Sequence, residues 1–169
     1  ISFDLSLEKR IALIETNEKD IKHITNELRK AVTPSIKKNR LFIQKHCSKI
    51  LIFSGGFKEI IIPIVSEYGI NEDQIFANEF IYDSDGNVIG IDKNNNMSKK
   101  SGKILMIKSL HLSGNIDVIG DGFTDYEIKK SGLATNFYAF IENINREKIS
   151  QLSDKVLNSF DDYIEIVND

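Results

Sequence analysis

Residues 116–125 read Ile116-Asp117-Val118-Ile119-Gly120-Asp121-Gly122-Phe123-Thr124-Asp125. The apolar residues favour a β-strand, and the two glycines allow a tight turn in which the backbone passes close to a carboxylate. Asp121 and Asp125 then lie past the carboxyl end of the strand, where open α/β sheets bind ligands. Because Mg²⁺ takes only one or two protein carboxylates, this segment predicts a magnesium site. Asp121 is the expected direct ligand, and Asp125 is a direct ligand or supports the coordination shell. Gly-Asp-Gly also forms ordinary turns, so the pattern alone leaves both interpretations open.

A second apolar strand ends in Ser54-Gly55-Gly56 and runs into a helical pattern that begins at Phe57. Free amides at a helix N-terminus, together with the helix dipole, favour a bound phosphate. The Ser54 hydroxyl can donate a hydrogen bond to it, and the glycines let the backbone approach closely. This segment predicts a phosphate site at Ser54 and Gly55, with a plain strand-to-helix turn as the alternative.

A third segment, Ser101-Gly102-Lys103, begins an amphipathic helical pattern. A lysine at a helix N-terminus opposes the helix dipole, so Lys103 requires a compensating anion. A phosphate beside carboxylates would serve that purpose. The alternative is a solvated surface lysine, since Lys99 and Lys100 lie nearby in the sequence.

In this order the three segments resemble motifs II, III and IV of the haloacid dehalogenase superfamily, specifically those of the phosphoserine phosphatase family. The resemblance covers nearly the whole chain. It includes Val32-Thr33-Pro34, the start of a hairpin at Ala77-Asn78-Glu79-Phe80, and a cap segment that carries Phe3 and Arg10. It implies a magnesium-dependent phosphomonoester hydrolase whose substrate is a small phosphorylated metabolite. L-phosphoserine, converted to L-serine and phosphate in serine biosynthesis, is the favoured substrate.

The resemblance also implies a role for each matching residue. Ser54, Lys103 and Asp121 would be catalytic, and Asp121 and Asp125 would hold Mg²⁺. The phosphoryl group would be bound by Ser54, Gly55, Lys103 and Thr124. Phe3 and Arg10 would contact the substrate, and a guanidinium is well shaped to bind a carboxylate through two hydrogen bonds. The alternative for Arg10 is a helix-surface arginine paired with a nearby acid.

One departure from the family pattern concerns the nucleophile. The family's nucleophile belongs to motif I, an Asp-x-Asp after the central strand. In this chain an Asp-x-Asp occurs at Asp83-Ser84-Asp85, between two apolar runs, where it predicts a hairpin turn. We therefore expect an N-terminally truncated chain that is inactive by itself, with the nucleophilic aspartate upstream. A catalytically silent binding fragment remains an alternative, as does a sister phosphatase or phosphotransferase acting on another phosphometabolite.

Composition narrows the class of protein. The chain has 169 residues, 41% hydrophobic and 28% charged, as in globular domains. Its net charge of −3 disfavours nucleic acid as a partner, and one cysteine gives no disulfide framework. No apolar run reaches the ~18 residues of a membrane-spanning helix. We expect a cytoplasmic enzyme with no nucleic-acid or membrane partner, and a homodimer stays open.

The alternation of strands and helices predicts an α/β fold with a Rossmann-like parallel sheet flanked by helices. Residues 1–32 would be the remnant of a small helical cap, and residues 33–169 a haloacid dehalogenase-like core with a hairpin at 78–91. The central motif I strand is missing from this chain. The expected core helices cover 35–47, 57–68, 102–111, 125–131 and 144–150, and the expected strands cover 49–53, 75–76, 116–119, 137–140 and the region of Lys155 and Val156.

Overall fold

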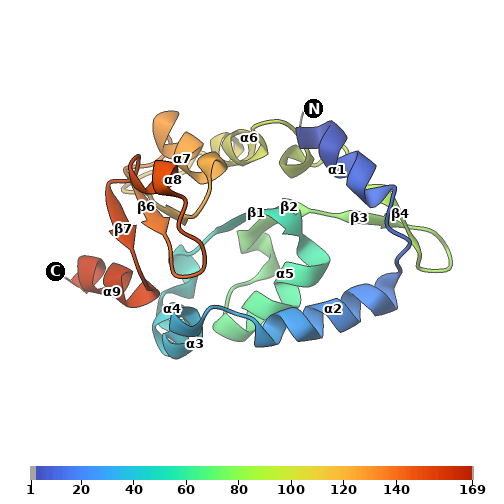
Figure 1. Cartoon of the computed structure of the whole chain (residues 1–169), viewed down its shortest axis with the longest axis horizontal. Coiled ribbons are helices and arrows are strands. Elements are labelled where there is room, and N and C mark those ends of the chain that lie inside the picture. The colour runs from blue at the N-terminus through green and yellow to red at the C-terminus, as the bar shows by residue number, and fades with distance from the viewer. Residues whose placement is uncertain (1–2, 169) are drawn as a thin grey trace. The chain divides into compact units, whose positions relative to one another are not determined.

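The computed structural model describes residues 3–168, without the side chains of residues 3–5 and 8. The chain is mixed α/β, as Figure 1 shows. It divides into two units, each built from two separate stretches of sequence. Unit 1 comprises Ile1–Val32 and Arg40–Gly102, and unit 2 comprises Thr33–Asn39 and Lys103–Asp169. The predicted cap domain (residues 1–32) and core domain (residues 33–169) do not coincide with these two units, and that assignment of domains stays a prediction.

Unit 1 begins with two helices, α1 (Phe3–Ile11) and α2 (Glu18–Lys30). Asn17 caps α2, because its Oδ1 accepts hydrogen bonds from the backbone N–H groups of Lys19 at 2.9 Å and Asp20 at 3.2 Å. The Asp20 carboxylate accepts in turn from Asn17 N at 3.3 Å. This reciprocal capping satisfies N–H groups that a helix start otherwise leaves unpaired. It fixes where α2 begins after the break at residues 12–17.

The rest of unit 1 combines a parallel strand pair with a hairpin. Helix α4 (Arg40–His46) precedes β1 (Ile52–Phe57), which pairs in parallel with β2 (Ile75–Asn78) through the crossover helix α5 (Lys58–Val65). Strands β3 (Phe80–Tyr82) and β4 (Val88–Ile91) form the predicted antiparallel hairpin. Helix α2 packs along α5, as Figure 1 shows.

Unit 2 contains a parallel sheet in the order β5-β6-β7. The strands are β5 (Asp117–Gly120), β6 (Asn136–Phe140) and β7 (Lys155–Leu157). The helices are α3 (Pro34–Lys38), α6 (Gly102–Ser109, which starts at the unit boundary), α7 (Phe123–Lys130), α8 (Glu147–Ser150) and α9 (Phe160–Asn168). Phe137, Ala139 and Ile149 form a buried cluster against which Val118 and Tyr126 pack. This apolar core holds β5, and with it the loop that follows β5, in place.

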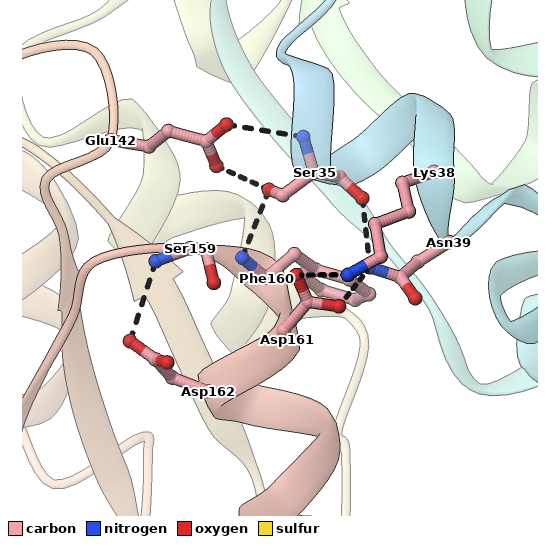
Figure 2. A network of polar contacts seen from close by, with 8 residues as sticks. All are labelled: Ser35, Lys38, Asn39, Glu142, Ser159, Phe160, Asp161 and Asp162. Carbon is pink, nitrogen blue, oxygen red and sulfur yellow. Dashed lines mark hydrogen bonds and ion pairs between the residues drawn. The ribbon is translucent and has the colours of Figure 1, made fainter.

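Polar contacts join α3 to segments more than a hundred residues later in the sequence (Figure 2). Ser35 N and Oγ both donate to the Glu142 carboxylate, and Ser35 Oγ accepts from Phe160 N at 2.9 Å. Asn39 Nδ2 donates to Asp161 Oδ1 at 2.9 Å. The Glu142 carboxylate thus satisfies an unpaired N–H at the start of α3. These bonds explain why residues 33–39 belong to unit 2.

The predicted α/β class is confirmed in its coarse form, since the parallel strands form two short sheets among the described residues, and the single Rossmann-like sheet stays a prediction. One expected helix needs correction. The helix expected over 35–47 breaks at Asn39, because the Asn39 side chain bonds Ser35 O and Asp161 instead of leaving the backbone to continue the helix. Helix α9 was not predicted.

Across residues 3–168, no helix is both long and apolar enough to cross a lipid bilayer.

Candidate functional site

The loop between β5 and α7 holds the first group of predicted site residues. Strand β5 ends at Gly120 and α7 begins at Phe123. Asp125 lies in the first turn of α7, where a negative charge is favourable, and its Oδ2 accepts from Gly122 N at 3.1 Å. A Cβ atom on Gly120 would clash with the Asp125 side chain. Glycine at this position is therefore a requirement of the loop, and it lets the carboxylate fold back over the end of the strand.

Lys103 and Asp125 form a largely buried ion pair. The distance from Lys103 Nζ to Asp125 Oδ1 is 2.5 Å, and the two side chains are 16% and 13% exposed. Lys103 is the second residue of α6, so Asp125 supplies the anion that a cation at a helix N-terminus requires. A solvated surface lysine, the alternative from the sequence, does not describe this residue.

Asp121 lies on the same loop but is half exposed. Its Oδ2 pairs with Arg146 Nη1, which also donates to the Asp121 backbone O at 2.9 Å. The exposed fractions of the two side chains, 49% for Asp121 and 47% for Arg146, leave both open to solvent. Sequence reasoning missed Arg146, which follows Asp121 by 25 residues in no recognisable spacing. The carboxylate predicted to bind a metal is thus paired with an internal cation.

The donor atoms of this loop are suited to a hard cation. Within residues 3–168, no group of three or more His, Cys, Asp or Glu side chains is placed to hold a metal ion. At this loop the described residues offer two carboxylates, Asp121 and Asp125, and Asp125 is already engaged by Lys103 and Gly122 N. One or two carboxylates are a sufficient protein share for Mg²⁺, which keeps several water ligands. Asp121 is the more accessible of the two.

Ser54 and Gly55 lie in unit 1, and their local structure differs from the expectation. Both belong to β1, which extends to Phe57 with an irregular register against β2, and α5 begins only at Lys58. Ser54 Oγ accepts from Gly56 N at 3.0 Å, and Gly55 O accepts from Asn78 Nδ2 at 2.9 Å. Residues 54–56 therefore form a bulged end of strand β1, and the N-terminus of helix α5 follows after them. Gly55 itself is exposed.

The remaining predicted residues divide between the units. Thr124 lies exposed in the first turn of α7, beside the loop with Asp121. Phe3 and Arg10 belong to α1 of unit 1. Arg10 is exposed, and the side chain of Phe3 lies outside the described residues. The structure thus groups Lys103, Asp121, Thr124 and Asp125 in unit 2, and leaves Phe3, Arg10, Ser54 and Gly55 in unit 1.

Comparisons with known proteins identify the relatives of this chain. No family model matches it. It is 26% identical over 97% of its length to the chloroplastic phosphoserine phosphatase of Arabidopsis thaliana, of which it spans 57%. It is 27% identical over its full length to the phosphoserine phosphatase of Homo sapiens, of which it spans 74%.

A solved structure gives the stronger match. The phosphoserine phosphohydrolase-like protein of Francisella tularensis subsp. tularensis SCHU S4 superposes with a TM-score of 0.82 at 34% identity, over 99% of this chain and 78% of that one. A mixed α/β fold with a Gly-Asp-Gly loop after a strand and a lysine paired to the second aspartate is of the haloacid dehalogenase type. Within that class, the chain belongs to the phosphoserine phosphatase-like family.

Proposed function

We propose that this chain is part of a magnesium-dependent hydrolase of phosphomonoesters, with L-phosphoserine as its substrate. The observation that carries the proposal is the largely buried Lys103–Asp125 pair beside the Gly120-Asp121-Gly122 loop. The names of the relatives support the substrate, since the Arabidopsis and human proteins are phosphoserine phosphatases.

Lys103 is proposed to stabilise the phosphoryl group as it is transferred. Phosphoryl transfer spreads negative charge over the phosphoryl oxygens, so catalysis consists mostly of positioning and electrostatic stabilisation. Asp125 accepts from the Lys103 ammonium, whose other N–H groups can donate to phosphate oxygens. Because the pair is only 16% and 13% exposed, its charges act through a medium less polar than water. Asp125 is then a positioning residue for Lys103.

The proposed cation site is Asp121, with Asp125 in support. When bound, Mg²⁺ would polarise the phosphoryl oxygens and neutralise part of their charge. The Asp121 carboxylate would turn from Arg146 to the cation, and the exposure of both side chains leaves room for that exchange. Ser54, Gly55 and Thr124 are proposed to bind the phosphoryl oxygens. Arg10, together with Phe3, is proposed to recognise the rest of the substrate through its carboxylate.

The proposal assigns the nucleophile to a segment outside these 169 residues. In the family that this chain resembles, an aspartate of an Asp-x-Asp after a strand forms an aspartyl-phosphate. The Asp83-Ser84-Asp85 segment follows β3 of the hairpin instead, and Asp83 Oδ1 is occupied by the turn itself, accepting from Asp85 N at 2.9 Å and Asn87 N at 2.8 Å. We therefore expect the chain alone to be inactive.

The test is phosphate release from L-phosphoserine with and without Mg²⁺, for this chain and for a version extended through the upstream reading frame. Magnesium-dependent release by the extended version alone supports the proposal. In that version, Lys103→Met should lower kcat/KM by about 10²–10³-fold, as the loss of a charge-stabilising donor does. Lys108→Met, an exposed lysine of the same helix, is the matched control.

Three other outcomes would reject parts of the proposal. Release by the 169-residue chain alone would show that the nucleophile is within it. Release from another phosphomonoester, but not from L-phosphoserine, would support the proposed hydrolysis reaction and reject L-phosphoserine as the substrate. No release from any phosphomonoester by either version would favour the silent binding fragment.

A further inference from the structure

The loop after β5 has each of its two carboxylates paired with a cation of the chain itself. Lys103 pairs with Asp125, and Arg146 pairs with Asp121. All four residues belong to unit 2. A divalent cation that binds at Asp121 therefore enters a loop whose charge is already balanced, and it must exchange with one of these internal cations.

The two pairs differ in how easily they separate. The Lys103 and Asp125 side chains are only 16% and 13% exposed, and separating a buried pair leaves a charge without compensation. The Arg146 and Asp121 side chains are 47% and 49% exposed. An ion pair with that exposure contributes little, because water can solvate both partners once they part. Arg146 is therefore the internal cation that exchanges, and Lys103 stays in place.

Arg146 holds Asp121 at two points. Its Nη1 donates to the Asp121 backbone O at 2.9 Å and also to Oδ2 of the same residue. Arg146 is the residue that directly precedes α8, so it reaches the loop from a different segment of unit 2. The contact to the main chain as well as to the carboxylate fixes the guanidinium beside the loop, and its positive charge then lies next to the proposed cation ligand.

From this geometry we infer, on the basis of the proposed function, that Arg146 is a positioning residue that competes with the divalent cation for Asp121. Its guanidinium occupies Asp121 Oδ2 and repels a second positive charge. A neutral hydrogen-bond partner would orient the carboxylate and raise its affinity for a metal ion, whereas the charge of Arg146 reverses that sign. Arg146 thus keeps Asp121 in place without a cation and lowers the affinity of the loop for one.

The test is the addition of Mg²⁺ to the 169-residue chain and to its Arg146→Gln variant, followed by the NMR amide signals of Gly120 and Gly122. Glutamine removes the charge and keeps a side chain that can donate to Asp121. It should tighten Mg²⁺ binding about tenfold, as expected when one positive charge a few ångströms from a divalent cation in water is removed.

Two further variants separate the contact from net charge. Lys148→Gln makes the same change in net charge at an exposed residue of α8 and should change the affinity by about twofold or less, because salt screens the longer distance. Arg146→Lys keeps the positive charge and should bind Mg²⁺ more weakly than Arg146→Gln does. Equal tightening by Lys148→Gln overturns the inference, and so does equal affinity of the two Arg146 variants.

The sign of the Arg146→Gln effect decides between the inference and its opposite. Unchanged or weaker Mg²⁺ binding by this variant overturns the inference, since a weaker affinity would make Arg146 a partner that only orients the carboxylate. Either result leaves the proposed cation site at Asp121 intact, because Mg²⁺ still binds. No binding by the unaltered chain or by any variant rejects the cation site, and the inference with it.

A second measurement on the unaltered chain covers the case in which Arg146→Gln does not fold. The carboxyl ¹³C signal of Asp121, the ¹⁵Nε signal of Arg146 and the ¹⁵Nζ signal of Lys103 are followed as Mg²⁺ is added. The Asp121 and Arg146 signals should shift with one saturation curve, while the Lys103 signal changes little. An Arg146 signal that does not move while Asp121 saturates overturns the inference, and an Asp121 signal that does not respond rejects the cation site itself.

Discussion

Lys103→Met removes the cation from a carboxylate that is itself largely buried. Removing one partner of a buried ion pair costs about 3–5 kcal/mol, because the other charge stays buried without compensation. Here the Asp125 side chain is 13% exposed and keeps the hydrogen bond from Gly122 N, both of which soften the loss. We therefore expect Lys103→Met to lower the free energy of unfolding by about 3 kcal/mol, at the low end of that range.

The assay is urea denaturation followed by circular dichroism, with a double-mutant cycle that adds Asp125→Asn. Asp125→Asn in the Lys103→Met background should recover part of the loss, since it removes the uncompensated charge. The resulting coupling energy should be about 2 kcal/mol, within the range for residues in contact. Lys108→Met, on the exposed side of α6, should change stability by less than about 0.5 kcal/mol. Additive effects at residues 103 and 125 would refute the reasoning, as would a loss for Lys103→Met no larger than that of Lys108→Met.

Three further predictions concern the loop, α3 and the dependence of stability on pH. Gly120→Ala should displace the Asp125 side chain, because the added Cβ would clash with it. The free energy of unfolding, measured by urea denaturation, should fall by about 1–3 kcal/mol. An unchanged urea midpoint would contradict the clash. Ser35→Ala should cost about 1–3 kcal/mol, because it removes the hydroxyl that bonds both the Glu142 carboxylate and Phe160 N. Loss of amide-exchange protection confined to α3 and the start of α9 would locate the effect, and unchanged protection there would count against it. The N–H of Phe137 and, to a smaller extent, Lys129 lower the pKa of Asp154 below its usual value of 3.8. The Asp154 carboxylate therefore stabilises the folded chain above pH 3.8, and this stabilisation is lost as the pH falls through the lower pKa of the folded state. Asp154→Asn should therefore flatten the acid limb of a plot of urea midpoint against pH, and an unchanged limb would exclude this role.

The sequence was most informative where a signal is local. The apolar residues Ile116, Val118 and Ile119 followed by Gly-Asp-Gly predicted β5, its loop and the helix after it, because a strand, a tight turn and a helix start each depend on neighbouring residues. The turn at Asp83-Ser84-Asp85-Gly86 predicted the hairpin for the same reason. Helix α9 also carries a local signal, because Asp161 and Asp162 occupy the first turn of an amphipathic helix.

Features that depend on distant residues could not be predicted in this way. Arg146 pairs with Asp121 across 25 residues, and Ser35 bonds Glu142 across 107. Neither pair leaves a periodic pattern or a spacing in the sequence. The break at Asn39 has the same origin, since its side chain reaches Asp161 across 122 residues. Lys103 is an intermediate case, because its opposition to the helix dipole predicted an anion without identifying Asp125.

The dependence of α3 on Glu142 has a consequence for how the protein is made. A ribosome adds about 5–20 residues per second, so the 107 residues that separate Ser35 from Glu142 take about 5–20 s to synthesise. Over that interval α3 lacks the carboxylate that accepts from Ser35 N, while the second stretch of unit 1 is translated. A helix of five residues is too short to persist without such contacts. The nascent chain therefore carries residues 33–39 as an unfolded bridge, open to chaperones and proteases, until nearly all of unit 2 has left the ribosome.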